Sequence, residues 1–582
     1  MPQTLIRWLP FGVSSHTPSR PLDIASAEGG AAPLARHPAW PILLISVWLA
    51  TVCNAALWRA LTALPNGTDL HSWGFVLAFA VIVAAGNVAV LSLLAWGRAT
   101  KWVLGSFVLM AAFGSYFMLN YGIVIDSSML TNVLQTDVRE AGDLLNWRLP
   151  VTVLVLAVPP LWWLWHHPVR PLGVVRHVAH NAGLLAAAVL VLVAALLLVF
   201  QDFASTMRNH TQLRYLINPL NSVYAVAHMA AKPLRMDTST LLPLGRDAQL
   251  GASYAQQAKA PLLVLVLGET ARSDHFGLNG YARNTTPLLS ARTDIVSAHN
   301  AWSCGTSTAA SLPCMFSHLG RDGFEGRKNN FENLLDVLSH AGLAVLWVDN
   351  QSGCKGVCDR VAQASTSRDT DPELCPAGEC SDTIMLKDLE QRIAALPAEQ
   401  RARGTVVVLH QMGSHGPAYF KRSTTSQKVF TPECTSNALQ ECGQAQVVNA
   451  YDNSMVATDA FLNATIEWLQ AQTPKAQTAM VYVSDHGESL GEGNVYLHGL
   501  PYRIAPDVQK HVPWVTWLSA EMQQRQQLGL GCLQKALTDQ RISHDAYFHS
   551  VLGLMDVQTT VYQRTQDIYA PCRNLQTAKV GS

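Results

Sequence analysis

The chain has 582 residues, more than one ordinary domain holds, so we expect at least two domains. Lysine plus arginine (41) balances aspartate plus glutamate (41), and a chain without a global basic field is not expected to bind nucleic acid. Charged residues make up only 14% and apolar residues 49%, and this imbalance is concentrated in the first 200 residues. Composition therefore predicts a membrane-embedded half and a more polar half.

Five apolar stretches are long enough to cross a bilayer, whose core of about 30 Å needs about 20 residues. They lie at 40–58, 72–96, 102–125, 149–165 and 182–200. The fourth is short and contains two prolines, which spanning helices tolerate. The first begins too far along the chain to be a cleaved signal peptide, so we interpret it as an anchor.

Basic residues orient this membrane half, because lysine and arginine gather in cytoplasmic loops. They precede the first stretch or lie between stretches two and three or four and five: Arg7, Arg20, Arg36, Arg98, Lys101, Arg170 and Arg176. We therefore expect a cytoplasmic segment at 1–38, a membrane domain of five helices at 39–202, a bridging segment at the membrane surface at 203–250, and a periplasmic catalytic domain at 251–582.

One short extracytoplasmic segment carries a polar stripe. Asn132, Thr136 and Glu140 recur every four residues, which places them on one face of a helix. The stripe is either the solvated face of an interfacial helix or a polar patch that meets a lipid headgroup, and spacing alone leaves both open.

The second half has the pattern of an α/β domain. Short apolar runs typical of strands lie at 261–269, 343–350, 404–411 and 480–487, and helical patterns such as 329–342 and 451–470 separate them. Runs this apolar, alternating with helices, predict a mostly parallel sheet with helices on both faces.

Ten of the eleven cysteines follow position 300, in the half predicted to be periplasmic, and an even number there indicates disulfides. Their spacing suggests four short loops and one long one, although sequence alone does not decide pairing. In the suggested order the cysteines are Cys304 and Cys314, Cys354 and Cys358, Cys375 and Cys380, Cys434 and Cys442, and Cys532 and Cys572. The competing interpretation is a zinc site formed by the four cysteines between 354 and 380.

Acids and histidines follow the predicted strands. Glu269 ends the first run, His415 lies shortly after the third, and Asp485 and His486 end the fourth, with His498 twelve residues after His486. Ligands of open parallel sheets bind beyond the carboxyl ends of the strands. Two carboxylates with histidines there form an oxygen and nitrogen ligand set that suits zinc.

A hydroxyl-rich segment between two cysteines offers a nucleophile. Thr306, Ser307 and Thr308 lie among small residues, which suit a helix start whose N–H groups cradle a phosphoryl oxygen. A hydroxyl needs a metal or a base before it attacks, and spacing does not choose among the three.

Five segments together resemble the bacterial lipid A phosphoethanolamine transferases, a family that includes the mobile colistin-resistance enzymes. These segments are 267–287, 304–317, 349–360, 410–417 and 482–492. The resemblance extends over most of the chain and implies an alkaline phosphatase/sulfatase-like periplasmic domain behind five spanning helices. It also implies a multi-pass protein of the bacterial inner membrane.

The resemblance assigns roles to individual residues. It implies zinc, one ion or two, bound by Glu269, Asp485 and His486, with Thr308 as the nucleophile that also contacts the metal. It further implies two histidines that bind the phosphoryl group or a second zinc, one lysine for substrate, and a polar stripe near the donor headgroup. These substrate residues are His415, His498, Lys355, Asn132, Thr136 and Glu140.

The implied reaction has two steps. Thr308 attacks the phosphorus of phosphatidylethanolamine and releases diacylglycerol, and a phosphate of lipid A then takes phosphoethanolamine from the threonine. His415 or His498 exchanges the proton. The expected partners are these two membrane lipids, and the expected catalytic unit is a monomer.

Several alternatives remain at this stage. The acceptor could instead be core heptose or a periplasmic glucan. A sulfatase would need a proline and an arginine after Cys304, where this chain has Gly-Thr-Ser-Thr. A lipoteichoic acid synthase-like enzyme shares five spans and a threonine nucleophile, but the late cysteines favour the ethanolamine enzymes. A catalytically inactive scaffold would fail to bind zinc.

Overall fold

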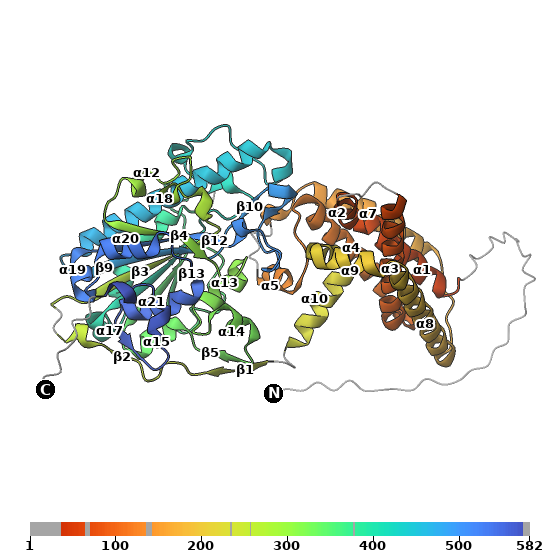
Figure 1. Ribbon diagram of the computed structural model, residues 1–582, viewed down its shortest axis with the longest axis horizontal. Helices are drawn as coiled ribbons and strands as arrows, with labels where there is room; N and C mark the ends of the chain where they lie inside the picture. The colour runs from red at the N-terminus through yellow and green to blue at the C-terminus, as the bar shows by residue number, and fades with distance from the viewer. Residues whose placement is uncertain are drawn as a thin grey trace, which may run out of the picture.

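The computed structural model describes residues 36–64, 70–135, 142–232, 236–255, 258–375 and 379–573. Figure 1 shows a helical membrane bundle on one side and an α/β domain on the other, with α5 (Ser127–Gln135) at their junction. The short helix therefore lies between the membrane bundle and the α/β domain.

The five predicted membrane spans are all present. They are Ala39–Thr62 (α1, Ala39–Thr51, and α2, Ala55–Thr62), Ser72–Leu94 within α3 (Leu70–Leu94), Gly97–Asn120 ending in α4 (Thr100–Asn120), Arg148–His166 (α7) and Val174–Leu198 (α8). The third ends at Asn120 rather than near residue 125, since Gly122 takes a φ of +68° that a helix does not contain. Helix α7 continues through Pro159 and Pro160.

After α8 the chain forms α9 (Phe200–Asn209), a 3-10 turn (Thr211–Leu216) and α10 (Leu220–Ala230). Asn218, just before α10, is fully buried against the bundle. Its amide donates to the carbonyls of Cys53 (3.1 Å) and Ala111 (2.7 Å), and its backbone N–H donates to Asn54 Oδ1 (2.9 Å). These bonds attach the connecting segment to the membrane helices.

The α/β domain contains an eight-stranded sheet. In spatial order its strands are β13 (Ile542–Ser543), β4 (Ile295–Trp302), β12 (His511–Leu518), β9 (Gln477–Ser484), β3 (Pro261–Gly268), β8 (Thr405–His410), β6 (Ala344–Asp349) and β7 (Ala362–Ser365). All neighbouring strands are parallel except that β12 runs antiparallel to β4 and β9. The mostly parallel sheet predicted from sequence is confirmed.

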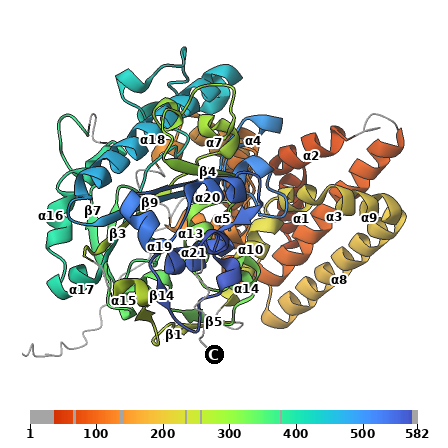
Figure 2. The ribbon, with the colours of Figure 1, turned by 60° about the vertical axis from the view of Figure 1, so that its left-hand side comes forward.

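Helices cover both faces of this sheet, as Figures 1 and 2 show. Along β3 the side chains alternate, with Leu263, Leu265 and Leu267 in one apolar core and Leu262 and Val264 in the other. The first core is covered by α15 (Leu334–His340), α19 (Ala520–Gln526), α20 (Leu530–Leu537) and α21 (Tyr547–Leu554), the second by α16 (Leu389–Ala394) and α18 (Gln444–Gln472).

The remaining elements are short. The helices are α12 (Pro287–Ser290), α13 (Thr308–Met315), α14 (Gly320–Gly326) and α17 (Ala398–Arg403). Three two-stranded pairs lie outside the main sheet: β1 (Asp237–Leu242) with β5 (Asn329–Phe331), β2 (Gln249–Leu250) with β14 (Val557–Gln558), and β10 (Ser489–Leu490) with β11 (Tyr496–Leu497).

The two halves share one apolar core. Tyr121, Ile123 and Met129, which lie between α4 and the end of α5, belong to the same buried cluster as the α18 face of the sheet. The backbone N–H of Tyr496 in β11 donates to the carbonyl of Tyr121 at 2.8 Å. The membrane domain is therefore packed against the edge of the catalytic domain.

Five disulfides join the ten late cysteines in the pairs suggested by spacing: Cys304–Cys314, Cys354–Cys358, Cys375–Cys380, Cys434–Cys442 and Cys532–Cys572. The alternative of a zinc site formed by the four cysteines between 354 and 380 is wrong, because a sulfur in a disulfide is no longer a thiolate ligand.

The Asn218 contacts lead to a stability prediction. Asn218→Ala removes the side-chain donor to two buried carbonyls, which costs about 1–3 kcal/mol, so we expect a lower thermal midpoint for the full chain in detergent. Asn209→Ala, an exposed asparagine on α9, is the matched control and should leave the midpoint unchanged. Equal midpoints for the two variants would contradict the anchoring role of Asn218.

Candidate functional site

Four predicted site residues stand where two neighbouring strands end and one helix begins. Glu269 directly follows β3, and Asp485 and His486 directly follow β9, its parallel neighbour. Thr308 is the first residue of α13. Because parallel neighbours share a carboxyl edge, residues more than 200 positions apart in sequence meet there.

The atoms of these four side chains lie within a few ångströms. Thr308 Oγ1 donates to Glu269 Oε2 at 3.0 Å and lies 3.4 Å from His486 Nε2. His486 Nε2 is 3.3 Å from Glu269 Oε1 and 3.4 Å from Asp485 Oδ2. By contrast Thr306 donates to the carbonyl of Leu500, so Thr308 is the hydroxyl that faces the acids.

This cluster is buried and incompletely hydrogen-bonded. Glu269, Asp485 and His486 are at most 1% exposed, and Glu269 Oε1 and Asp485 Oδ2 have no hydrogen-bond partner among the described residues. Burial, and then the charge of Asp485, raises the pKa of Glu269 above its ordinary value. Two buried carboxylates need a compensating positive charge, which a metal ion or a protonated His486 would supply.

The geometry fits one divalent metal ion. One ligand atom from each of Glu269, Asp485 and His486 can be chosen so that all lie within 4.8 Å of one another. Two oxygens and one nitrogen form a set that suits zinc and similar ions, and Thr308 Oγ1 lies at its edge. These residues could therefore hold a metal beside a hydroxyl nucleophile.

Helix α13 is fastened to the loop that carries Asp485. Ser311 Oγ donates to the carbonyl of Asp485 at 2.5 Å, and His544 Nδ1 accepts from the backbone N–H of Cys304 at 3.1 Å. His544 Nε2 lies 3.0 Å from the carbonyl of Ser484. Burial lowers the pKa of His544 to about 3, so its imidazole is neutral and can accept and donate at once.

Two glycines permit the close packing of backbone around the site. A Cβ at Gly305 would lie 2.8 Å from Ala310 Cβ, inside the first turn of α13. Gly413 has a φ of +51°, and its Cβ would lie 2.7 Å from the carbonyl oxygen of Glu269. Larger residues at either position would displace Thr308 or Glu269.

A second layer holds Glu269 in place. Gln351 Nε2 donates to Glu269 Oε2 at 2.5 Å. His410, fully buried at the end of β8, has its Nδ1 3.0 Å from Asp349 Oδ2. Burial alone would raise the pKa of Asp349. The nearby His410 and the hydrogen bonds to the carboxylate outweigh burial and lower the pKa of Asp349 to about 2. An ionised Asp349 therefore orients His410 next to the acids.

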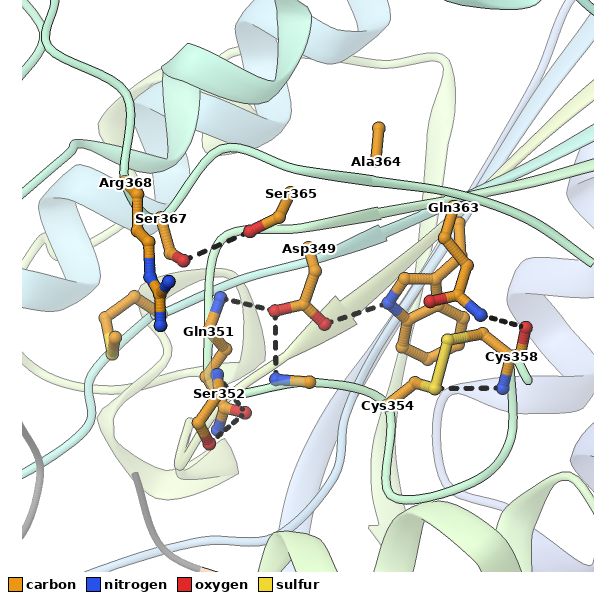
Figure 3. A pocket seen from close by; sticks show the side chains of 13 residues that line it. Asp349, Gln351, Ser352, Cys354, Cys358, Gln363, Ala364, Ser365, Ser367 and Arg368 are labelled. Atoms are coloured by element: carbon orange, nitrogen blue, oxygen red, sulfur yellow. Dashed lines mark hydrogen bonds between the residues drawn. A yellow bond between two sulfur atoms is a disulfide. The ribbon is translucent and has the colours of Figure 1, made fainter. Parts of the chain in front are cut away.

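Figure 3 shows how Asp349 also shapes the loop after β6. Its Oδ1 accepts from the backbone N–H groups of Gln351 (2.9 Å) and Gly353 (3.2 Å), and its Oδ2 accepts from Trp347 Nε1 (2.9 Å). A hollow of about 460 Å³ lies against this loop, with Arg368 among its lining residues. The carboxylate fixes the backbone that presents Gln351.

The two other predicted histidines stand next to His486. The ring centroid of His498 lies 4.4 Å from that of His486 and 5.5 Å from that of His415. His498 Nδ1 is 3.2 Å from Glu488 Oε2, a carboxylate whose pKa is raised well above its ordinary value by burial. Burial, and then His486, holds the pKa of His498 well below its usual range.

Both domains line the pocket in front of Thr308, which encloses about 60 Å³. From the membrane domain come Ile123, Met129, Asn132 and Leu144, and from the catalytic domain Thr308, Gln351, Ser352, Lys355, His415, Gly416, Leu497 and His498. Lys355 Nζ lies 3.1 Å from Ser352 Oγ and donates to the carbonyl of Gln135 at the end of α5, also at 3.1 Å. The structure thus brings Asn132 and Lys355 to the pocket of Thr308, whereas Thr136 and Glu140 lie outside the described residues.

Some residues around the site were not predicted. Gln351 stands four positions before Lys355. Its position in the segment 349–360 was the only feature of the sequence that could have indicated a role at the site. Ser311 follows Thr308 by one helical turn, which would have suggested a common face. Nothing in the sequence pointed to His544, which lies 236 residues after Thr308. It comes near the site only through tertiary contacts such as its hydrogen bond to Cys304.

Comparison with known proteins gives two family matches, a sulfatase model at residues 261–557 and a phosphoethanolamine transferase EptA/EptB model at residues 83–234. Phosphoethanolamine transferase EptA of Salmonella typhimurium is 38% identical over 551 residues, covering 93% of this chain and 98% of the relative. The chain belongs to the phosphoethanolamine transferase family. Its catalytic domain is of the sulfatase type, and it is a transferase.

Two further relatives in this family are informative. Phosphatidylethanolamine transferase Mcr-1 of Escherichia coli is 38% identical over 502 residues, covering 83% of this chain and 89% of the relative. The structure of the integral membrane lipooligosaccharide phosphoethanolamine transferase A of Neisseria meningitidis matches with a TM-score of 0.86 at 34% identity, covering 92% and 99% of the two chains. This transferase is accordingly an inner-membrane protein with a periplasmic catalytic domain.

The buried ligand set predicts metal content. We expect about one divalent ion per chain by mass spectrometry of the digested protein, and at least about tenfold weaker retention after Asp485→Asn, which removes one charged ligand. Asp359→Asn is the matched control, since this exposed acid lies beside the Cys354–Cys358 disulfide and should not alter metal content. A metal-free wild-type protein that gains no thermal stability from added zinc would contradict the site.

The neutral His544 predicts a pH dependence. Its folded pKa of about 3 lies below the unfolded value of about 6.5, so the unfolded state binds the extra proton and stability falls as pH drops below 6.5. The slope from this residue is about 1.4 kcal/mol per pH unit. Denaturant unfolding of wild type and His544→Asn between pH 7.5 and 5.5 should show the smaller slope in the variant, and equal slopes would be evidence against a buried neutral imidazole.

Proposed function

We propose that this protein transfers phosphoethanolamine from phosphatidylethanolamine to a phosphate of lipid A through a phosphoethanolamine-threonine intermediate on Thr308. The observation that carries the proposal is Thr308 Oγ1, 3.0 Å from Glu269 and 3.4 Å from His486, in a pocket that the membrane domain helps to form. A nucleophile in such a pocket is within reach of a substrate that remains anchored in the bilayer.

Zinc is the proposed cofactor, held by Glu269, Asp485 and His486. When bound it supplies Lewis-acid chemistry, which lowers the pKa of a neighbouring hydroxyl and neutralises phosphoryl oxygens. The two carboxylates and the imidazole match zinc in ligand type, and their open oxygens support the assignment.

In the first step Thr308 Oγ1 attacks the donor phosphorus, the bond to the diacylglycerol oxygen breaks, and that oxygen takes up a proton. The backbone N–H groups at the start of α13 face the phosphoryl oxygens. Lys355 adds positive charge, and His415 and His498 line the same pocket as proton carriers. The name of the relative Mcr-1 supports phosphatidylethanolamine as donor.

In the second step an oxygen of the acceptor phosphate attacks the same phosphorus, and the bond to Thr308 Oγ1 breaks and returns the hydroxyl. The acceptor is proposed from the relative of Neisseria meningitidis, whose name specifies lipooligosaccharide. Transfer to lipid A would mask phosphate charge and so weaken the binding of cationic peptides. One chain supplies the residues of this site, so we propose the monomer as the catalytic unit.

The nucleophile is tested by mass spectrometry of lipid A from cells that express the full chain. The wild type should add one phosphoethanolamine group, and Thr308→Ala should lose the gain and the covalent adduct on the protein, because no other described hydroxyl donates to Glu269. Ser307→Ala is the matched control and should retain both. An adduct that persists in Thr308→Ala would rule out the mechanism, and a wild-type adduct without modified lipid A would move the acceptor to core heptose or glucan.

A further inference from the structure

A second cleft, which we call the α13 cleft, adjoins the pocket of Thr308. It has a volume of about 450 Å³, enough for a phosphorylated sugar, and it shares Lys355 with that pocket. Ala309, Ala310 and Pro313 of α13 form part of its wall. The helix that begins with the nucleophile therefore borders the cleft.

The charged side chains that line the α13 cleft are mostly basic. Lys232, Arg327, Lys355 and Arg360 line it, and Glu332 is the acid among its lining residues. The Glu332 carboxylate is already engaged, since it accepts from Arg246 at 2.7 Å and from the backbone N–H of Leu244 at 2.9 Å. Arg360 is likewise neutralised by Asp336, which accepts two bonds of 2.6 Å from its guanidinium.

Lys232 and Arg327 are different, because neither forms an ion pair within the part of the chain that the structure describes. Burial, and then the charge of Arg327, lowers the pKa of Lys232, and burial lowers the pKa of Arg327. The two cations line the same cleft, where their like charges repel each other. A bound anion between them would remove this repulsion and gain charge-assisted hydrogen bonds.

The membrane-side helices α5 and α10 carry exposed apolar or aromatic side chains. On α5, Thr131 and Gln135 line the cleft, whereas Val133 and Leu134 are more than half exposed. On α10, which ends two residues before Lys232, Tyr224 is 68% exposed. A cationic cleft lined in part by α5, a helix that also carries exposed apolar residues, is suited to an anionic amphiphile.

We propose that the α13 cleft binds the acceptor glycolipid through Arg327 and Lys232, which hold a second anionic group of that lipid while its other phosphate reaches Thr308. The inference rests on the proposed function and specifies how that function selects its acceptor. It follows that an acceptor with two phosphates is used more efficiently than the same lipid with one.

The test compares full-length Arg327→Gln and Lys232→Gln with wild type in phosphatidylcholine nanodiscs. The donor is a fluorescent phosphatidylethanolamine, and the acceptor is lipid A with either two phosphates or one. For the two-phosphate acceptor we expect kcat/KM to fall about tenfold or more, the effect of one charge-assisted bond. For the one-phosphate acceptor, and for formation of the Thr308 adduct, variants and wild type should agree within about twofold.

Lys328→Gln is the matched control, because this exposed lysine is adjacent in sequence to Arg327 but does not line the cleft. It should behave as wild type with both acceptors. If Arg327→Gln slows both acceptors equally, or loses the adduct, its role is structural and the proposal fails. If the variants change only the response to added phosphatidylglycerol, the cleft serves bulk anionic lipid, which also overturns it.

A binding measurement separates this proposal from the proposed function. Binding of two-phosphate lipid A to Thr308→Ala protein should weaken about tenfold when Arg327→Gln is added, and catalysis is not required for this result. Equal binding with and without Arg327→Gln refutes the cleft assignment. If wild type forms no adduct but binding still depends on Arg327, the reaction mechanism is wrong and the lipid site is retained.

Discussion

The architecture depends on keeping two carboxylates and one imidazole together in a dry site. Glu269, Asp485 and His486 are almost completely buried, and carboxylate oxygens of both acids remain open. Buried like charges repel, so the site is stable only with a cation or with protonation, and burial already raises the pKa of Glu269. A parallel sheet meets this requirement because the ends of β3 and β9 hold the acids on rigid, fully hydrogen-bonded strands.

The surroundings of the site serve the same constraint. Ser311 and His544 join α13, which begins with Thr308, to the loop that carries Asp485, and Gln351 donates to Glu269. The absence of a side chain at Gly413 lets the loop after β8 pass directly against Glu269. Each contact limits movement of Thr308 relative to the ligand set, and small displacements of a nucleophile reduce rates strongly.

The membrane domain completes the site rather than merely anchoring it. Asn132 of α5 lines the same pocket as Thr308, and Lys355 reaches the carbonyl of Gln135 at the end of α5. Docking through the shared core around Tyr121 places this helix against the catalytic domain. With this arrangement the phosphate of a lipid substrate can reach the pocket while the lipid stays at the membrane surface.

The sequence by itself indicated the five spans, the parallel core strands and the acids and histidines at the strand ends, because hydrophobic period and strand-end chemistry are local signals. It missed β4, β7, β12 and β13: β7 is a polar edge strand, and β4 and β12 carry polar or proline interruptions that only their pairing partners compensate. Tertiary structure alone decided which hydroxyl faces Glu269, that His544 supports α13, and that Lys232 and Arg327 line the same cleft. These facts depend on contacts between residues up to hundreds of positions apart in the sequence. The periodicity of a single sequence reports local structure and does not show which distant residues meet.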